Sequence, residues 1–185
     1  MTDARYERSR AAVHEAVCSV LVAEGISGLT ADRLAEESGV SRSTIYRNWP
    51  DMAALACEVF DELMHREPVD LEGDPSEAML DYLSDYARRL NDPVYTAVLV
   101  ALIDGSTRDD AFADVHRRAF SQNRSRAAAV VHRLQQADLV ETDRDVHQCV
   151  EDMVAPFLFR ALVLQQRITV GQIRDLHGDL LQRWS

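Results

Sequence analysis

The chain has 185 residues, 46% of them hydrophobic, with only 7 Gly and 5 Pro, so it can bury a substantial core in one or two helical domains. A formal net charge of −11 argues against a protein that coats nucleic acid, but residues 1–50 hold 6 Arg against 7 acidic residues and most of the excess lies further on. The polar start, and apolar runs too short to span a bilayer, predict a soluble, cytoplasmic chain.

Residues 29–55 predict short helices joined by tight turns. Thr30 can cap a first helix, and Gly39 can supply the left-handed residue that ends it. Ser41 can cap a second helix that closes before Pro50, and Asp51 can cap a third. Two helices separated by so short a turn indicate a helix-turn-helix that reads DNA.

A helical wheel of residues 42–49 divides the second of these helices into faces. Ile45 and Trp49 fall on one side, which we expect to face the core, while Ser43 and Arg47 point the opposite way. In a major groove, Arg47 could donate two hydrogen bonds to a guanine edge, worth about 1–3 kcal/mol of discrimination. The residues expected to contact DNA are Thr30, Arg42, Ser43, Thr44, Tyr46, Arg47 and Asn48.

The run LTADRLAEESGVSRSTIYRNWPDMAAL, from Leu29 to Leu55, resembles the N-terminal helix-turn-helix of the TetR family of repressors. The resemblance implies a three-helix DNA-binding domain in a dimeric, ligand-responsive transcription factor. Met52 departs from the pattern, because family members usually carry there a lysine that holds a DNA phosphate. We therefore expect weaker nonspecific DNA affinity. The matching positions are Thr30, Leu34, Ala35, Gly39, Val40, Ser41, Thr44, Ile45, Tyr46, Trp49 and Leu55, with Ala12, Ala16, Val20 and Leu21 in the preceding helix.

The remainder of the chain predicts helices throughout, so the expected fold is all-α with about nine helices. The sequence Asp74-Pro75-Ser76-Glu77 opens one helix, Asn91-Asp92-Pro93 opens the next, and another runs from about Thr107 to Gln136. The expected domains are a DNA-binding domain in residues 1–50, a connecting helix in residues 51–66, and a helical ligand-binding and dimerisation domain in residues 67–185.

The last two predicted helices carry apolar residues at spacings of three and four, and Pro156 is expected to kink the first of them. Thr169 and Gln172 form a capping box that opens the second. Such stripes suit the core of a single chain, but the family resemblance implies a four-helix bundle with a second copy. The expected dimer interface is Val146, Val150, Phe157, Ala161, Leu164, Ile173, Leu176, Leu180 and Trp184.

An effector cavity is expected between the helices of residues 75–165. Its apolar and aromatic candidates predict a small hydrophobic or aromatic ligand, although most of them also suit a plain core. These candidates are Tyr82, Tyr86, Tyr95, Leu99, Leu102, Phe112, His116, Phe120, Met153 and Phe157.

Rival chemistry has little support in the sequence. The six His show no HExxH spacing, paired CxxC motifs are lacking, and the chain has no GxSxG elbow, P-loop or GxGxxG. We therefore expect no catalytic residue, no metal, no cofactor and no enzymatic activity. The three cysteines suit reduced thiols, and Cys149 is expected to be a buried thiol more readily than a redox sensor.

The resemblance to the TetR family thus implies a bacterial, cytoplasmic homodimer that represses transcription. Its partners would be a palindromic or near-palindromic double-stranded operator and a small-molecule effector of unknown identity, with no membrane. The alternative is an all-helical ligand-binding or catalytic protein that retains the helix-turn-helix for packing only. Arg47 separates the two readings, because an outward arginine has no packing purpose.

Overall fold

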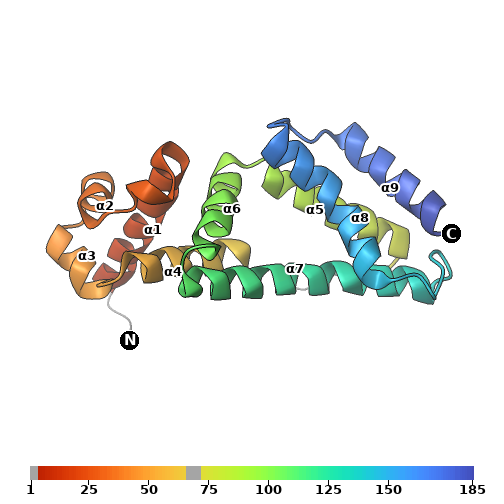
Figure 1. Ribbon diagram of the computed structural model, residues 1–185, viewed down its shortest axis with the longest axis horizontal. Coiled ribbons are helices and arrows are strands. Elements are labelled where there is room, and N and C mark those ends of the chain that lie inside the picture. Colours follow the sequence, from red (N-terminus) through yellow and green to blue (C-terminus); the bar gives the residue numbers. More distant parts are fainter. Residues whose placement is uncertain (1–3, 66–71) are drawn as a thin grey trace. The chain divides into compact units, whose positions relative to one another are not determined.

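The computed structural model describes residues 4–65 and 72–185, and these residues form nine α-helices, a 3-10 turn and a π-helical turn, with no strand among them (Figure 1). The predicted all-α class is confirmed. None of the described helices combines the length and apolar character needed to cross a membrane. The helices are α1 (Ala4–Glu24), α2 (Ala31–Ser38), α3 (Arg42–Asn48), α4 (Met52–Met64), α5 (Pro75–Leu90), α6 (Pro93–Ser106), α7 (Asp110–Gln136), α8 (Val146–Leu158) and α9 (Val170–Trp184).

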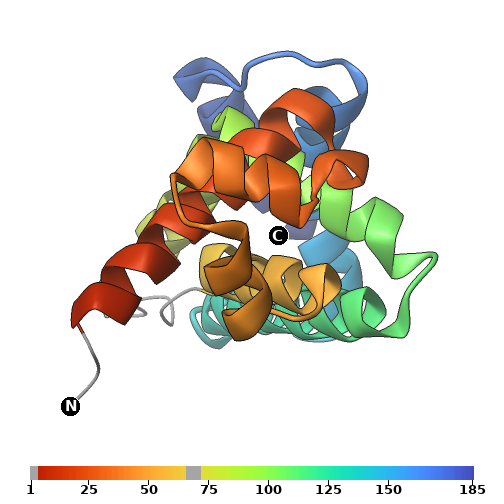
Figure 2. The same ribbon diagram turned by 90° about the vertical axis from the view of Figure 1, so that its left-hand side faces the viewer.

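The chain divides by packing into two compact units, and the first comprises residues 1–65 and 93–119. In this unit α1 is the central element, because it packs against α2, α4 and α6. Figure 2 views this unit from the side of its N-terminal helices. The buried residues at its centre include Val13, Val17, Val20, Leu34, Ile45, Phe60 and Leu102.

The second unit comprises residues 66–92 and 120–185. In it α5 packs against both α8 and α9. Asn91 fixes the loop before α9 to the end of α5: its Nδ2 donates to the Ile168 carbonyl at 2.9 Å, and its Oδ1 accepts from the Ile168 amide at 2.8 Å. The core of this unit includes Met79, Leu83, Leu134, Met153, Leu180 and Trp184.

The predicted helix starts and stops are confirmed at their caps. Side chains at the N-caps of α2, α3, α4, α5 and α9 accept backbone amide hydrogens, and α9 has the full capping box of Thr169 and Gln172. Gly39 ends α2 with φ at 68°, in the left-handed region. The predicted start of α7 near Thr107 lies three residues early, because Asp109 caps the helix: its Oδ1 accepts from the Ala111 amide at 2.8 Å.

The helix predicted to run past Pro156 to Leu164 changes type instead of continuing as one α-helix. Its α-helical part ends at Leu158, and residues 159–163 form a π-helical turn. Proline has no amide hydrogen and so removes one rung of the hydrogen-bond ladder. Three residues later, the amide of Phe159 is shared between the carbonyls of Ala155 and Pro156. The loosened ladder accommodates the wider turn.

The packing units follow a different division from the predicted domains. The end of the predicted connecting helix and the start of the next domain fall on residues 66–71, outside the described residues. Helix α6 and the start of α7 pack with the N-terminal helices, although the sequence places them within residues 67–185. The order of helices along the sequence does not predict that α6 and the start of α7 pack with the N-terminal helices.

Candidate nucleic-acid interface

Helix α3 is held by its own cap and by two buried side chains. The Ser41 hydroxyl accepts from the Thr44 amide at 3.3 Å and lies 2.9 Å from the Thr44 hydroxyl. Ile45 is 0% exposed and Trp49 is 5% exposed, so the predicted inward side of the wheel is confirmed. With that side buried, the remaining faces of α3 are turned outward.

The outward faces of α3 carry the side chains expected to meet DNA. Arg42, Ser43, Tyr46 and Arg47 are exposed, and Thr44 and Asn48 are half-buried. Thr30, the seventh residue of the expected set, is exposed at the start of α2, where its hydroxyl accepts from the Arg33 amide at 3.2 Å. The exposure of these residues agrees with the wheel, and their contact with DNA stays a prediction.

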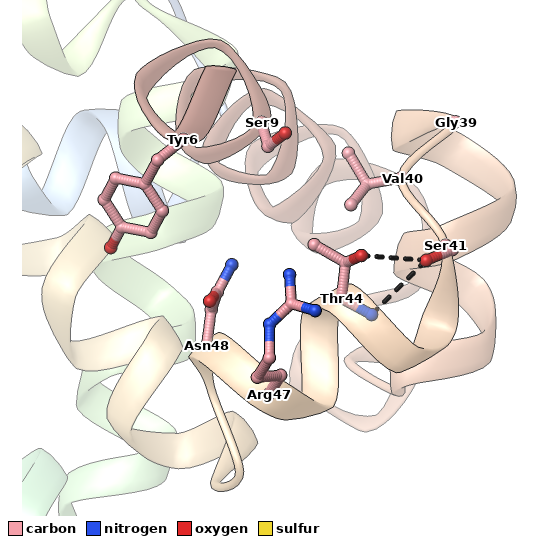
Figure 3. Close-up of a pocket in the computed structure, with 8 residues that line it drawn as sticks. All are labelled: Tyr6, Ser9, Gly39, Val40, Ser41, Thr44, Arg47 and Asn48. Carbon is pink, nitrogen blue, oxygen red and sulfur yellow. Dashed lines mark hydrogen bonds between the residues drawn. The ribbon is translucent and has the colours of Figure 1, made fainter. Parts of the chain in front are cut away.

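A hollow lies between α3 and the first turns of α1 (Figure 3). Figure 3 shows the side chains of Arg47 and Asn48 directed toward Tyr6 and Ser9 of α1. Tyr6 and Ser9 are not among the residues expected to contact DNA, although their spacing of three residues on α1 places both on one helical face. The residues that line the hollow are Tyr6, Ser9, Gly39, Val40, Ser41, Thr44, Arg47 and Asn48.

Arg42 is engaged at this surface by two neighbours. Its Nη1 lies 2.6 Å from Asp32 Oδ1 of α2, and its guanidinium carbon lies 5.4 Å from the centre of the Tyr46 ring. A hydrogen bond with Tyr46 and the negative charge of Asp32 hold the pKa of Arg42 above its ordinary value. The guanidinium is therefore positioned on the outer surface of α2 and α3 before any partner arrives.

A polar network braces α3 from behind. Trp49 Nε1 donates to Glu58 Oε2 of α4 at 2.9 Å, and Arg10 Nε of α1 donates to Glu58 Oε1 at 2.7 Å. Arg10 also pairs with Glu62 through Nη2. These bonds tie the end of α3 to α1 and α4, so Arg10 stabilises the packing of these three helices.

The first turn of α4 offers no cation for a phosphate. Met52 is half-buried there, and Asp51 Oδ1 caps the helix by accepting from the Ala53 amide at 2.9 Å. A phosphate near this helix start would meet an acid and a thioether, and the loss of one backbone contact stays a prediction.

The expected effector-pocket residues are divided between the two units. Tyr82, Tyr86, Phe120, Met153 and Phe157 belong to the second unit, and the other five belong to the first. Within the second unit, the Tyr82 and Tyr86 rings stack with centroids 6.2 Å apart, and the Arg89 guanidinium lies 5.3 Å from the Tyr86 ring centre. Eight of the ten are buried and His116 and Phe120 are half-buried. The pocket itself stays a prediction.

Most of the expected dimer-interface residues face the core of the single chain. Val150, Phe157, Ile173, Leu180 and Trp184 are each at most 7% exposed within the second unit. In this conformation they are covered by the chain's own helices, and their place in a dimer interface stays a prediction. The periodic stripe marks the buried side of each helix, and periodicity alone does not distinguish a core from an interface. Of the rest, Leu164 is exposed and Val146, Ala161 and Leu176 are half-buried.

Two of the three thiols, those of Cys57 and Cys149, lack the features of a reactive cysteine. Cys149 is 0% exposed, and burial raises the pKa of its thiol. Burial, with the charges of Asp61 and Asp109, raises the pKa of Cys57 to about 11. Thiols with raised pKa hold little of the nucleophilic thiolate near neutral pH.

Comparisons with known proteins cover nearly the whole chain. Residues 15–59 match the family model of bacterial regulatory proteins of the tetR family, and residues 68–180 match that of the tetracyclin repressor-like C-terminal domain. The chain is 26% identical over 174 residues to YdeS of Bacillus subtilis, an uncharacterised HTH-type transcriptional regulator, covering 93% of this chain and 87% of that one.

Solved structures show the same fold. The TetR family transcription regulator SCO0332 is 26% identical, with a TM-score of 0.63 over 94% of this chain and 97% of that chain. A TetR transcriptional regulator from Agrobacterium tumefaciens is 16% identical, with a TM-score of 0.74 over 95% of this chain and 94% of that chain.

Proposed function

The chain belongs to the TetR family of bacterial transcriptional regulators, and we propose that it is a homodimeric repressor that a small hydrophobic or aromatic effector releases from its operator. The observation that carries the proposal is the division of α3 into two sides. Ile45 and Trp49 are buried, while Ser43, Tyr46 and Arg47 are exposed. A helix pair retained for packing alone has no use for such an outward set.

Operator recognition is assigned to the outward side of α3. Arg47 would donate to a guanine edge in the major groove, with Thr44 and Asn48 beside it. Tyr6 and Ser9 lie across the hollow, where hydroxyl groups can donate to backbone phosphates. Arg42 would reach a phosphate from its place between Asp32 and Tyr46.

Dimerisation is assigned to the exposed side of the C-terminal helices. Phe159, Val163, Leu164 and Val170 are 44–64% exposed, an unusual concentration of large apolar side chains on a surface. A nearby hollow between α8 and α9 is lined by Ala155, Pro156, Phe159 and Leu176, with charged residues of both signs around it, among them Glu151, Asp179 and Arg183. Apolar residues ringed by both signs of charge suit a self-complementary, two-fold contact.

Effector control follows from thermodynamic linkage between effector binding and operator binding. Two recognition helices must reach successive major grooves, about 34–36 Å apart. An effector that prefers a dimer whose recognition helices are further apart or closer together weakens operator binding. By linkage, the operator weakens effector binding by the same factor. Within the second unit, apolar and aromatic surface for such a ligand is supplied by the expected pocket residues Tyr82, Tyr86, Phe120, Met153 and Phe157. A DNA partner also implies the cytoplasm as its location and a role other than catalysis.

The test is fluorescence anisotropy with labelled DNA from upstream of the protein's own gene, at two salt concentrations and against scrambled competitor. Specific binding that weakens with salt supports a DNA-binding regulator. Without preference for that DNA, a genome-wide selection of bound fragments follows. If the selection enriches no sequence, the protein is not a sequence-specific regulator. Compounds that lower the anisotropy of the specific complex identify effectors.

A further inference from the structure

We infer that His14, Glu58 and Glu62 form a binding site for a divalent transition-metal ion between α1 and α4. One ligand atom from each of the three side chains can be chosen so that all lie within 4.8 Å of one another. The site lies within the first packing unit and on the side of α1 and α4 that braces Trp49. It is distinct from the surface assigned to DNA and stands independently of the proposed function.

The ring of His14 supplies the second observation. His14 is 9% exposed, and its Nε2 is buried without a hydrogen-bond partner. Glu58 Oε1 nevertheless lies only 3.2 Å from that nitrogen. A distance of 3.2 Å is short enough for a hydrogen bond, so its absence means that the angle is poor: Glu58 Oε1 lies well away from the direction of an N–H bond at Nε2. A neutral nitrogen would then place its lone pair beside a carboxylate, which favours a cation between the two atoms.

The separation of those two atoms matches a shared metal ion. Zinc lies about 2.0–2.2 Å from histidine nitrogen and carboxylate oxygen. Two ligands at such distances are roughly 3 to 3.5 Å apart when the angle at the metal is between octahedral and tetrahedral. The other ring nitrogen, Nδ1, lies 2.9 Å from Glu62 Oε2. Metal-bound histidines commonly donate their second N–H to a carboxylate in this way, and Glu62 can alternatively turn to bind the ion directly.

The donor set defines the class of ion. One imidazole nitrogen with carboxylate oxygens suits Zn²⁺, Co²⁺, Ni²⁺ or Mn²⁺, and the absence of a thiolate among the three side chains disfavours soft Cu⁺. The Glu62 side chain is 49% exposed and that of Glu58 is 33% exposed. An ion can therefore enter from solvent, and water can complete its coordination.

Arg10 is the competitor for this site. It donates to Glu58 and to Glu62, so its charge neutralises part of the negative charge that a metal would use. A proton on His14 competes as well, because Nε2 must be deprotonated to bind a metal. These two competitors determine the expected direction of change in metal affinity. Removing Arg10 should raise the affinity, and lowering the pH should reduce it.

Trp49 provides the readout. Its ring centroid lies 6.2 Å from that of His14, and its Nε1 donates to Glu58. The chain has 2 Trp, so a Trp184→Phe background leaves Trp49 as the single indole. In tag-free protein stripped with a chelator, Co²⁺ should quench Trp49 fluorescence with one ion per chain, and Zn²⁺ should displace the Co²⁺.

Four variants in that background decide the inference, with calorimetric titration of Zn²⁺ beside the quenching. His14→Gln and Glu62→Gln should each weaken binding at least about tenfold, and Arg10→Met should tighten it. His132→Gln removes an exposed histidine of α7 and should leave binding unchanged. Circular dichroism checks that each variant is folded, and Glu62→Gln carries the test if His14→Gln is not. Absent or superstoichiometric binding, or equal affinity in wild type and folded site variants, overturns the assignment in favour of a proton on His14 alone.

Discussion

Asp32 of α2 pairs with Arg42, the first residue of α3, with 2.6 Å between Asp32 Oδ1 and Arg42 Nη1. Both side chains are more than half exposed, at 66% and 57%, so the pair contributes little to stability. Its importance is positional, because it lies on the surface where we propose that DNA phosphates arrive. A carboxylate and a phosphate compete for the same guanidinium.

Asp32→Asn is therefore expected to increase DNA affinity, about 2- to 5-fold at low salt, because it removes a negative charge from the interface and releases Arg42 to a phosphate. Anisotropy titrations with specific and scrambled DNA measure the change, and both should tighten similarly. Glu36→Gln is the matched control: it removes the same charge from an exposed position of α2 that is 3.6 Å from Arg33 and not paired with Arg42. Equal increases in DNA affinity from both variants would mean that the change in net charge, and not the release of Arg42, causes the effect.

The elements that sequence could predict are those with local causes. The cap at Ser41 and the left-handed stop at Gly39 need only residues within one turn, and both are present. The wheel of α3 likewise needs one helix and one core, and it placed Ile45 and Trp49 correctly. Local chemistry therefore determined the helix-turn-helix almost completely.

Features with distant causes were not predictable in the same way. The apolar stripe that includes Leu180 and Trp184 predicts that these side chains are covered but not which surface covers them, and both are buried within the single chain. Tyr6 and Arg47 line the same hollow, and His14 contacts Glu58 and Glu62, only because α3 and α4 fold back beside α1. Such meetings depend on packing between segments 41 or more residues apart, which no spacing rule encodes.

Arg47→Ala is expected to preserve stability and to relax sequence preference at one base pair in each half-site. The side chain is exposed, so its loss removes no core contact, whereas a bidentate contact to guanine contributes about 1–3 kcal/mol of discrimination. Selection from a randomised operator library, with wild type in parallel, measures the preference at each position. Arg117→Ala, at an exposed position of α7, is the control. A large drop in melting temperature with an unchanged binding motif would contradict this assignment of the reading face.

Two glycines provide a test of backbone conformation without steric crowding. A Cβ added at Gly39 or at Gly178 meets no atom within 4 Å, but only Gly39 has a positive φ, at +68°. Gly39→Ala should therefore lower the free energy of unfolding by about 1–2 kcal/mol through left-handed strain alone. Gly178→Ala, inside α9, should raise it by about 0.5–1 kcal/mol. Urea unfolding of both variants measures the two signs, and destabilisation by Gly178→Ala would show an unrecognised contact there.

Val163→Glu should convert the proposed dimer to a monomer. Val163 is 64% exposed on the turn after α8, so a charge there is tolerated in the single chain and is costly only if a second copy covers it. Val100→Glu is the matched control, because Val100 of α6 is 51% exposed and lies in the other unit. Size-exclusion chromatography with light scattering gives the mass of each variant. A wild-type monomer, or a dimer that survives Val163→Glu, would place the interface elsewhere or remove it.

Glu58 should make the first unit sensitive to acid. Burial raises the pKa of Glu58, but the hydrogen bonds from Trp49 and Arg10, with the charges of His14 and Arg10, outweigh burial and hold that pKa below its ordinary value. A carboxyl whose pKa is lowered on folding stabilises the folded state above its unfolded pKa, about 4.3 for glutamate, and this contribution is lost as the pH falls through the folded value.

Glu58→Gln keeps the size of the side chain and an acceptor for Trp49, and it abolishes the charge. Its melting temperature should lie furthest below that of wild type at neutral pH, and the gap should close as the pH falls below about 4. In Trp184→Phe protein, Trp49 fluorescence follows the unfolding of this unit alone. Glu62 also has a lowered pKa, because the bonds from Arg10 and His14 outweigh its burial, so some acid sensitivity remains in the variant. A gap that widens in acid would mean that Glu58 is protonated in the folded protein and that the brace behind α3 is not ionic.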